Sequence, residues 1–443
     1  MKPKRSFNAL FWPIFIELLF FMLMGTIDTI MLSNYSDFAA GSVGNANTIV
    51  QMFAVLLLIV ANGVAVLVSQ YLGAKKDDVA KRMIGSGIII NFFVGLLLAS
   101  TLFFSASFIL RAVNTRSVLF DDSFTYLRII SISLFFVAMS NIISSSLRSF
   151  GFAKYITFTV MVANVLNIIG NYILINGHFG FPRLGVYGAA ISTLGVRVLI
   201  LGFYFFLLIK VIKVQLKDFK LDAQSTKQIF RVGLPSAAET WTYTIMQMII
   251  LSFINSFGAE FTTARTYVNT ILTYIYVFSL AFAAANAVMT GYYIGERNYE
   301  KAYNETIKVL IRSFMIVTTM TLLVNLSSGI IMGLFTNNTI IIETARKVLW
   351  LAILLEFGRS INLILIQALR SAGDTAFPLK MALLSMFGVA VPTAYIFGVW
   401  VGLGLLGIYI AYTLDELIRA GFMFVRWQSK KWEAKSSYID KTT

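Results

Sequence analysis

The chain lacks cysteine altogether and has a single histidine among its 443 residues. Thiol catalysis, disulfide bonds and cysteine-ligated metal sites are therefore excluded. The histidine, His178, lies in a glycine-rich stretch, NGHFGFP. We interpret it as a loop residue rather than a metal ligand, because one imidazole in such a loop does not make a metal site.

Charged residues are also scarce. They make up 13% of the chain, whereas hydrophobic residues make up 58%; soluble domains are nearer about 25% charged. A chain of this composition predicts an integral membrane protein with the lipid bilayer as its main partner. The net charge of +15 could indicate nucleic-acid binding. We do not expect a nucleic-acid partner, because the basic residues gather at the ends of hydrophobic runs in alternate loops.

Several catalytic motifs are missing. The chain has no Gly-Lys dipeptide and hence no Walker A loop, which excludes an ATP-driven motor within it. It also has no His-Glu-x-x-His and no Gly-x-Ser-x-Gly motif. We therefore expect no enzyme activity and no cofactor, and we expect an ion gradient to supply the energy for uphill transport.

Long hydrophobic runs recur along the whole chain. They are far too long for the roughly 10-residue strands of a membrane barrel, so each predicts a transmembrane helix. The fold class is thus an all-α integral membrane protein with twelve transmembrane helices. The runs are 7–32, 43–72, 83–110, 124–147, 155–176, 185–212, 229–256, 263–294, 307–334, 345–369, 378–400 and 403–427.

The loops differ in basic charge. Alternate loops are rich in Lys and Arg, which places them and both termini in the cytoplasm by the positive-inside rule. The first run lacks a small-residue cleavage site and is expected to remain as a helix. The cytoplasmic basic residues include Lys2, Lys4, Arg5, Lys75, Lys76, Lys81, Arg82, Arg148, Lys154, Arg297, Lys301, Arg370, Lys380, Arg426, Lys430, Lys431 and Lys435.

The two halves of the chain repeat each other with a fixed offset of 222 positions. SQYLGAKK in the first half resembles GYYIGERN in the second, and LRSFG resembles LRSAG. Two parallel repeats of six helices predict two lobes related by a pseudo-twofold axis, with a central cleft between them. We expect lobes at 1–212 and 229–428, a cytoplasmic linker at 213–228 and a cytoplasmic tail at 429–443. The landmarks with this offset are Pro13 and Pro235, Glu17 and Glu239, Gly73 and Gly295, and Arg148 and Arg370.

Carboxylates within the first predicted helix are informative, because ionisable groups in a bilayer are costly. Glu17 and Asp28 lie 11 residues apart, about three helical turns, and so share nearly one face. Amide side chains at Asn164, Asn167 and Asn171 form a polar stripe on the fifth predicted helix.

Two interpretations of this stripe are open. With oxygens from Asn141, Ser192 and Thr193, it could form a hard-cation site. It could equally be interhelical hydrogen bonding that holds the lobe together. The presence of Asp28 in the same lobe favours the cation site, and any metal ion is expected to be Na⁺ at Asp28.

The second lobe carries charged residues of its own. Glu239 is the repeat partner of Glu17. Glu356 and Arg359 are spaced to pair on one helix. Asp415, Glu416 and Arg419 form a second group that can neutralise itself. The many Phe and Met residues could also line a promiscuous apolar pocket.

Several segments together resemble a known family. MGTIDTIMLS around Asp28 resembles the first-helix motif of multidrug and toxic compound extrusion (MATE) transporters. LNIIGNYILINGHFGFPRLGVYGAA resembles the helix 5–6 signature of their bacterial NorM-like branch, and GLPSAAE and LRSAGDTAFP also fit. The resemblance covers essentially the whole chain.

The resemblance implies a twelve-helix exporter driven by Na⁺ or H⁺ entry, in the bacterial inner membrane. It implies that Asp28 couples to the cation, with Asn141, Asn167, Asn171 and Thr193 as companions. Archaeal-type members have Asp where this chain has Asn171. NorM-like members have carboxylates where this chain has Tyr243 and, nearby, Arg359, so the pattern of the second lobe departs from theirs.

We therefore predict a monomeric antiporter of amphipathic, cationic organic compounds that works by alternating access. The expected substrate-contacting residues are Glu17, Glu239, Tyr243, Glu356 and Arg359. An alternative is a flippase of lipid-linked oligosaccharides, which would need cationic groups such as Arg197 and Arg359 facing its cargo. A receptor or scaffold without transport activity is a third class, which repeated lobes with buried carboxylates do not favour.

Overall fold

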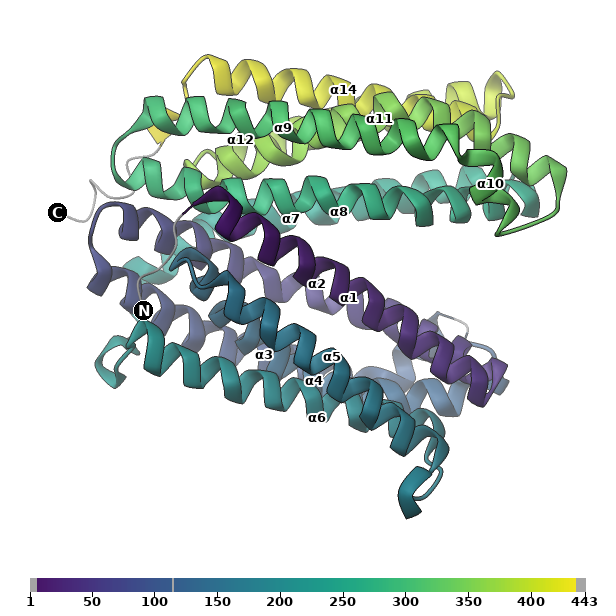
Figure 1. Ribbon diagram of the computed structural model, residues 1–443, viewed down its shortest axis with the longest axis horizontal. Helices are drawn as coiled ribbons and strands as arrows, with labels where there is room; N and C mark the ends of the chain where they lie inside the picture. The colour runs from purple at the N-terminus through teal and green to yellow at the C-terminus, as the bar shows by residue number, and fades with distance from the viewer. Residues whose placement is uncertain (1–5, 114, 436–443) are drawn as a thin grey trace. The chain divides into compact units, whose positions relative to one another are not determined.

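The computed structural model describes residues 6–113 and 115–435. The chain divides into two compact units, Met1–Gly233 and Leu234–Thr443. The predictions made for Lys2, Lys4 and Arg5, and for residues 436–443 of the tail, lie outside the described residues. Each unit is a bundle of long helices, which Figure 1 colours from purple to teal and from teal to yellow.

Unit 1 holds six long helices joined by short turns, and a seventh begins in it. A short π-helical turn, Leu208–Ile212, extends the sixth helix. The long helices are α1 (Phe7–Tyr35), α2 (Asp37–Gly73), α3 (Asp77–Ala112), α4 (Ser117–Ser149), α5 (Ala153–Asn176), α6 (Gly185–Leu207) and the start of α7 (Ala223–Asn255).

Unit 2 repeats this order. The stretch 376–400 is one continuous helical run in which α-helical and π-helical turns alternate around Pro392. The helices are α8 (Ala259–Gly295), α9 (Tyr299–Leu326), the short α10 (Ser328–Gly333), α11 (Thr339–Ser371), α12 (Ala376–Ser385), η4 (Met386–Ala390), α13 (Val391–Thr393), η5 (Ala394–Trp400) and α14 (Leu405–Gln428).

Within residues 6–113 and 115–435, ten helical segments are long and apolar enough to cross a membrane. The long helices α7 and α14 are not among these ten, and α14 carries Asp415, Glu416 and Arg419 in its middle. Together with those ten they make the twelve helices of an all-α integral membrane protein. Sequence patterns thus predicted the number of spans, including the two that are not among these ten segments.

The helix boundaries repeat the sequence offset. Helix α2 and its counterpart α8 both have 37 residues, and α4 and α11 both have 33. Each pair begins and ends 222 positions apart. The turns also match, because Gly151 and Gly373 both adopt positive φ after α4 and α11. The internal repeat is therefore a repeat of structure as well as of sequence.

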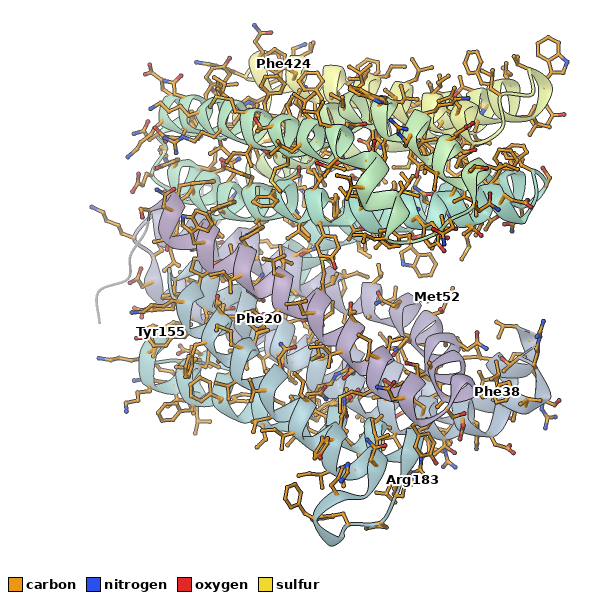
Figure 2. The ribbon with its side chains drawn as sticks, turned by 45° about the vertical axis from the view of Figure 1, so that its right-hand side comes forward. Phe20, Phe38, Met52, Tyr155, Arg183 and Phe424 are labelled. Atoms are coloured by element: carbon orange, nitrogen blue, oxygen red, sulfur yellow. The ribbon has the colours of Figure 1, made fainter. Side chains whose placement is uncertain are left out.

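Large apolar side chains point away from the helix bundles. Phe38, Met52 and Phe424 project outward in Figure 2, with exposed fractions of 59%, 52% and 42%. On α3, Phe104 and Phe108 are more exposed still. Such surfaces are unfavourable in water and favourable against hydrocarbon chains, as expected of membrane helices.

One helix organises each bundle. In unit 1, α4 packs against α2, α3 and α6; in unit 2 its repeat partner α11 packs against α8, α9 and α14. The unit 1 core includes the fully buried Leu102, Leu127 and Ile175.

The boundary between the units lies inside α7, between Gly233 and Leu234. The first turns of α7 belong to unit 1 because they pack on α2. Tyr71 donates a hydrogen bond to Gln228 Oε1 over 3.3 Å. Gly233 lies so close to the Ile59 carbonyl that a Cβ atom could not be placed there. Pro235 lies two positions after Gly233 in the same helix.

The segment that precedes α7 packs against α3 and is hydrogen-bonded to it. Ser86 Oγ donates to the Lys220 carbonyl over 2.6 Å, and Gly85 packs directly against the carbonyl of Asp218. Asp222 then caps α7 by accepting a 2.7 Å hydrogen bond from Ser225 N–H. Burial raises the pKa of Asp222, but the Ser225 and backbone hydrogen bonds outweigh it and hold the pKa below its usual value.

Gly85→Ala should test this attachment. The added methyl group would overlap the Asp218 carbonyl, so we expect a loss of about 1–3 kcal/mol in the free energy of unfolding. Gly202→Ala on α6 is the matched control, because nothing lies within 4 Å of its Cβ position. Denaturant unfolding in detergent measures both. Equal stability of the two variants would contradict the packing described here.

Candidate functional site

Asp28 lies on α1 where this helix packs against α5. Its side chain is half-buried. Asn171 Nδ2 donates a 2.6 Å hydrogen bond to Asp28 Oδ1. A short amide–carboxylate bond in a region of low dielectric holds the carboxylate in one orientation.

A chain of hydrogen bonds leads from Asp28 into the bundle. Asn171 Nδ2 also approaches Asn167 Oδ1 at 3.3 Å, and Asn167 Nδ2 lies 3.4 Å from the hydroxyl oxygens of both Ser192 and Thr193. All four of these residues are buried. Helices α1, α5 and α6 therefore contribute to one polar cluster, which we call the Asp28 cluster.

Local sequence explains why α5 and α6 approach so closely. Gly170 faces Ser192, and a Cβ atom there would collide with the Ser192 hydroxyl. Asn167 and Asn171 are one turn apart and so lie on one face of α5. Asn171 Oδ1 is buried and has no hydrogen-bond partner among the described residues. The cluster thus presents an acceptor oxygen beside the carboxylate.

Asn164, a member of the predicted polar stripe, and Asn141, a predicted companion of Asp28, behave differently. Asn164 Nδ2 donates over 2.8 Å to the Val160 carbonyl of its own helix and so leaves the polar stripe. Asn141 on α4 is half-buried, and its carbonyl accepts from Ser144 Oγ. None of the hydrogen bonds found in residues 6–113 and 115–435 joins the Asn141 side chain to the Asp28 cluster.

Arg197 and Tyr126 belong to the surroundings of this site, although the sequence did not place them there. Arg197 lies one turn after Thr193 on α6 and donates to Ser133 Oγ on α4. It interacts electrostatically with both Asp28 and Tyr126. The sequence could have indicated this position, because Arg197 lies four residues after Thr193 and therefore on the same face of α6. A fixed positive charge near Asp28 is a feature that the amide stripe alone did not indicate.

The repeated glutamates have repeated partners. Arg148 Nη2 lies 2.6 Å from Glu17 Oε1, and Arg370 Nη2 lies 2.8 Å from Glu239 Oε2. The arginines stand in the last turns of α4 and α11. Glu17 and Glu239 were predicted as substrate-contacting residues; the structure places each in an ion pair. The 222-position offset shared by all four residues could have identified both pairs.

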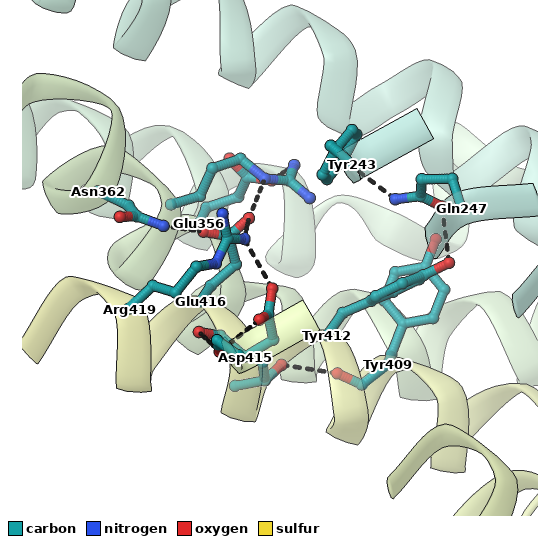
Figure 3. Close-up of polar contacts among 12 residues, drawn as sticks. Tyr243, Gln247, Glu356, Asn362, Tyr409, Tyr412, Asp415, Glu416 and Arg419 are labelled. Carbon is teal, nitrogen blue, oxygen red and sulfur yellow. Dashed lines mark hydrogen bonds and ion pairs between the residues drawn. The ribbon is translucent and has the colours of Figure 1, made fainter. Parts of the chain in front are cut away.

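The other predicted residues of the second lobe also have partners. Arg359 pairs with Glu356 and lies 3.8 Å from Glu416 Oε1. Tyr243 accepts a 2.7 Å hydrogen bond from Gln247 Nε2 (Figure 3). Glu356 is fully buried, and Tyr243 and Arg359 are partly buried. Arg359 is thus neutralised within its own unit.

The chemistry of the Asp28 cluster is that of an oxygen-rich site with one carboxylate. No group of three or more His, Asp or Glu side chains in the described part of the chain could together hold a metal ion. A single carboxylate with amide and hydroxyl oxygens suits a monovalent hard cation or a proton rather than a tightly held divalent ion.

Comparison with known proteins places the chain in a family. A family model described as MatE matches residues 13–173 and 235–396. The two matched segments begin 222 positions apart, at the two repeated prolines. The model therefore matches each half of the internal repeat separately.

Curated relatives cover nearly the whole chain. An uncharacterized transporter of Bacillus subtilis, YisQ, is 36% identical over 98% of this chain and 97% of its own length. A probable multidrug resistance protein NorM of Thermotoga maritima is 25% identical over 94% and 90%.

Solved structures agree in fold. A crystal structure of MATE in the bent conformation has a TM-score of 0.88 at 22% identity, covering 100% of this chain and 97% of that one. A transporter of the MOP superfamily from Pyrococcus furiosus has a TM-score of 0.87 at 22% identity, covering 96% and 95%. With the family model matched in both halves, this chain belongs to the MatE family and is a multi-pass membrane transporter, not an enzyme.

Proposed function

We propose that this protein is a secondary active exporter of amphipathic, cationic organic compounds, driven by entry of Na⁺ or H⁺ through alternating access. The observation that carries the proposal is the Asp28 cluster. It offers an ionisable carboxylate, held by Asn171 at 2.6 Å, in a helix of a protein with no ATP-binding motif. The names of several relatives, among them the NorM proteins, support a role in drug export.

The coupling role rests on competition for one group. A carboxylate can hold a proton or help to coordinate Na⁺, but not both at once. Occupancy can drive transport only if two conformations of the protein bind the ion with different affinity. We further propose that the protein acts as a monomer in the bacterial inner membrane with both termini in the cytoplasm, and that it needs no cofactor besides its coupling ion.

A flippase for lipid-linked oligosaccharides would need unpaired cationic groups for a pyrophosphate cargo. Arg359 is paired with Glu356, and Arg197 bonds to Ser133 near Asp28. No specific observation favours this alternative, and the drug exporter remains our proposal.

Purified protein in liposomes tests the function. We expect a cationic dye to be moved when a Na⁺ or pH gradient is imposed, and to stay at equilibrium when the gradient is dissipated by an ionophore. Imposing each gradient alone identifies the coupling ion. If no compound of a broad panel of organic cations moves under either gradient, the substrate assignment is wrong. Movement that is independent of both gradients would reject the coupling.

A further inference from the structure

Five charged side chains lie buried together between α11 and α14 of unit 2. The sequence suggested two separate groups, one on each helix; the structure joins them (Figure 3). The exposed fraction of each side chain is at most 18%. We call this set the α11–α14 cluster; its members are Glu356, Arg359, Asp415, Glu416 and Arg419.

The two arginines bridge the three carboxylates. Arg419 Nη2 lies 2.6 Å from Asp415 Oδ2 and 3.0 Å from Glu416 Oε1. Arg359 Nη1 pairs with Glu356 Oε1, and its Nε lies 3.8 Å from Glu416 Oε1. Each guanidinium therefore forms ion pairs with two carboxylates, and every ion pair of these five residues joins two members of the cluster.

The charges of the cluster do not balance. Three carboxylates and two guanidiniums leave one excess negative charge if all are ionised. The groups that face the cluster from neighbouring helices do not compensate, because Tyr243 from α7 and Tyr276 from α8 carry phenol groups, which bring no positive charge. Glu239 of α7 interacts with Arg419 but has its own partner in Arg370. From α9, Ser313 contacts Ser360 of α11, and this pair of hydroxyl groups brings no charge.

The hydrogen bonds show which of the three carboxylates still has an oxygen atom without a donor. Both oxygens of Asp415 are used, because Oδ1 accepts a 2.6 Å bond from Ser385 and Oδ2 faces Arg419. Both oxygens of Glu416 are used, since Oε2 accepts a 2.8 Å bond from Asn362 Nδ2. Glu356 uses only Oε1.

One carboxylate oxygen of the cluster, Glu356 Oε2, is buried without a partner among the described residues, as is Oδ1 of Asn362, which donates to Glu416 from beside the cluster. An unpartnered carboxylate oxygen in a buried site carries the full cost of its lost hydration. The cluster thus has one excess negative charge, and of its three carboxylates Glu356 is the one with an oxygen that lacks a partner.

We propose that the α11–α14 cluster is a proton-binding site, with one exchangeable proton held on Oε2 of Glu356. A proton needs a single oxygen, and binding it makes the cluster neutral. A metal ion fits poorly, because the guanidiniums occupy the positions between the carboxylates and repel another cation. The inference concerns unit 2 alone and does not depend on Asp28 being the coupling residue.

Infrared spectroscopy of the full-length protein in lipid tests this site without measuring transport. Protein labelled with isotopic glutamate should show the C=O stretch of a protonated glutamic acid at neutral pH. The signal should vanish in Glu356→Gln, which leaves two carboxylates and two guanidiniums. It should persist in Asp28→Asn and in Glu305→Gln, a matched change in an exposed pair with Lys308.

A second variant and two contrary results complete the test of the proton site. Asp415→Asn also balances the cluster, so it should abolish the glutamic acid signal even though Glu356 is intact; this variant serves as well if Glu356→Gln fails to fold. The proposal is overturned if wild type shows no protonated glutamic acid at neutral pH, or if its signal survives both substitutions. A Na⁺-dependent rise in melting temperature that Glu356→Gln removes, without an acid signal in wild type, would identify a metal site instead.

Discussion

Asp28→Asn should reduce gradient-driven efflux to the level of membranes that lack the transporter. The substituted amide keeps the size of the side chain and an acceptor for Asn171, so folding and insertion should be retained. It removes the charge that either coupling ion needs, and without differential ion binding the gradient cannot bias the conformational equilibrium. Dye efflux from energised cells, normalised to membrane abundance, measures the loss.

The matched control is Asp122→Asn, which makes the same chemical change at an exposed position on α4. It should keep nearly all of the wild-type efflux, as should Arg183→Gln, whose guanidinium lies over the Tyr35 ring away from the Asp28 cluster. Near-wild-type efflux by Asp28→Asn at equal abundance would reject the coupling role. Glu17, Glu239 and the carboxylates of the α11–α14 cluster would then be the groups to examine.

Substituting either repeated glutamate should destabilise the protein by removing one partner of a largely buried ion pair. The exposed fractions are 15% and 28% for Glu17 and Arg148, against 10% and 11% for Glu239 and Arg370. An arginine left unpaired costs more where water is less accessible. We expect losses of about 2 kcal/mol for Glu17→Gln and about 3 kcal/mol for Glu239→Gln.

Denaturant unfolding in mixed micelles measures these losses. Glu305→Gln is the control, because its pair with Lys308 is exposed and should contribute less than about 1 kcal/mol. The combined variant should lose roughly the sum, since the two pairs share no partner. A large effect at one glutamate and none at the other would show that the two pairs are not equivalent, despite their identical positions in the repeat.

Much of the fold was predictable because membrane helices must satisfy their backbone hydrogen bonds within themselves. Long apolar runs therefore translate directly into helices, and the fixed offset translates into matching boundaries for α2 and α8. The irregular helical run 376–400 was not predictable in the same way. Its π-helical turns depend on tertiary packing, as where η4 and η5 pack against α14.

The candidate site was only partly predictable. Asn167 and Asn171 share a helical face by spacing alone, so their joint membership of the Asp28 cluster could be expected. Contacts between helices distant in sequence could not. The hydrogen bond from Asn362 to Glu416 joins α11 to α14. Asn141 was expected to belong to the cation site, but none of the described hydrogen bonds joins its side chain to the Asp28 cluster. Periodicity gives the face of a helix and does not say which neighbour that face meets.

The turns after α2 and α8 show a conflict between two demands on one residue. Lys75 and Arg297, 222 positions apart, both have φ of 57°. That conformation costs a non-glycine residue about 1–2 kcal/mol, which glycine would avoid. Yet both halves carry a cation there, in loops that we propose to be retained in the cytoplasm during biosynthesis. A redesign guided by folded-state energy alone would choose glycine at both turns, and would thereby erase part of the signal that orients the nascent chain in the membrane.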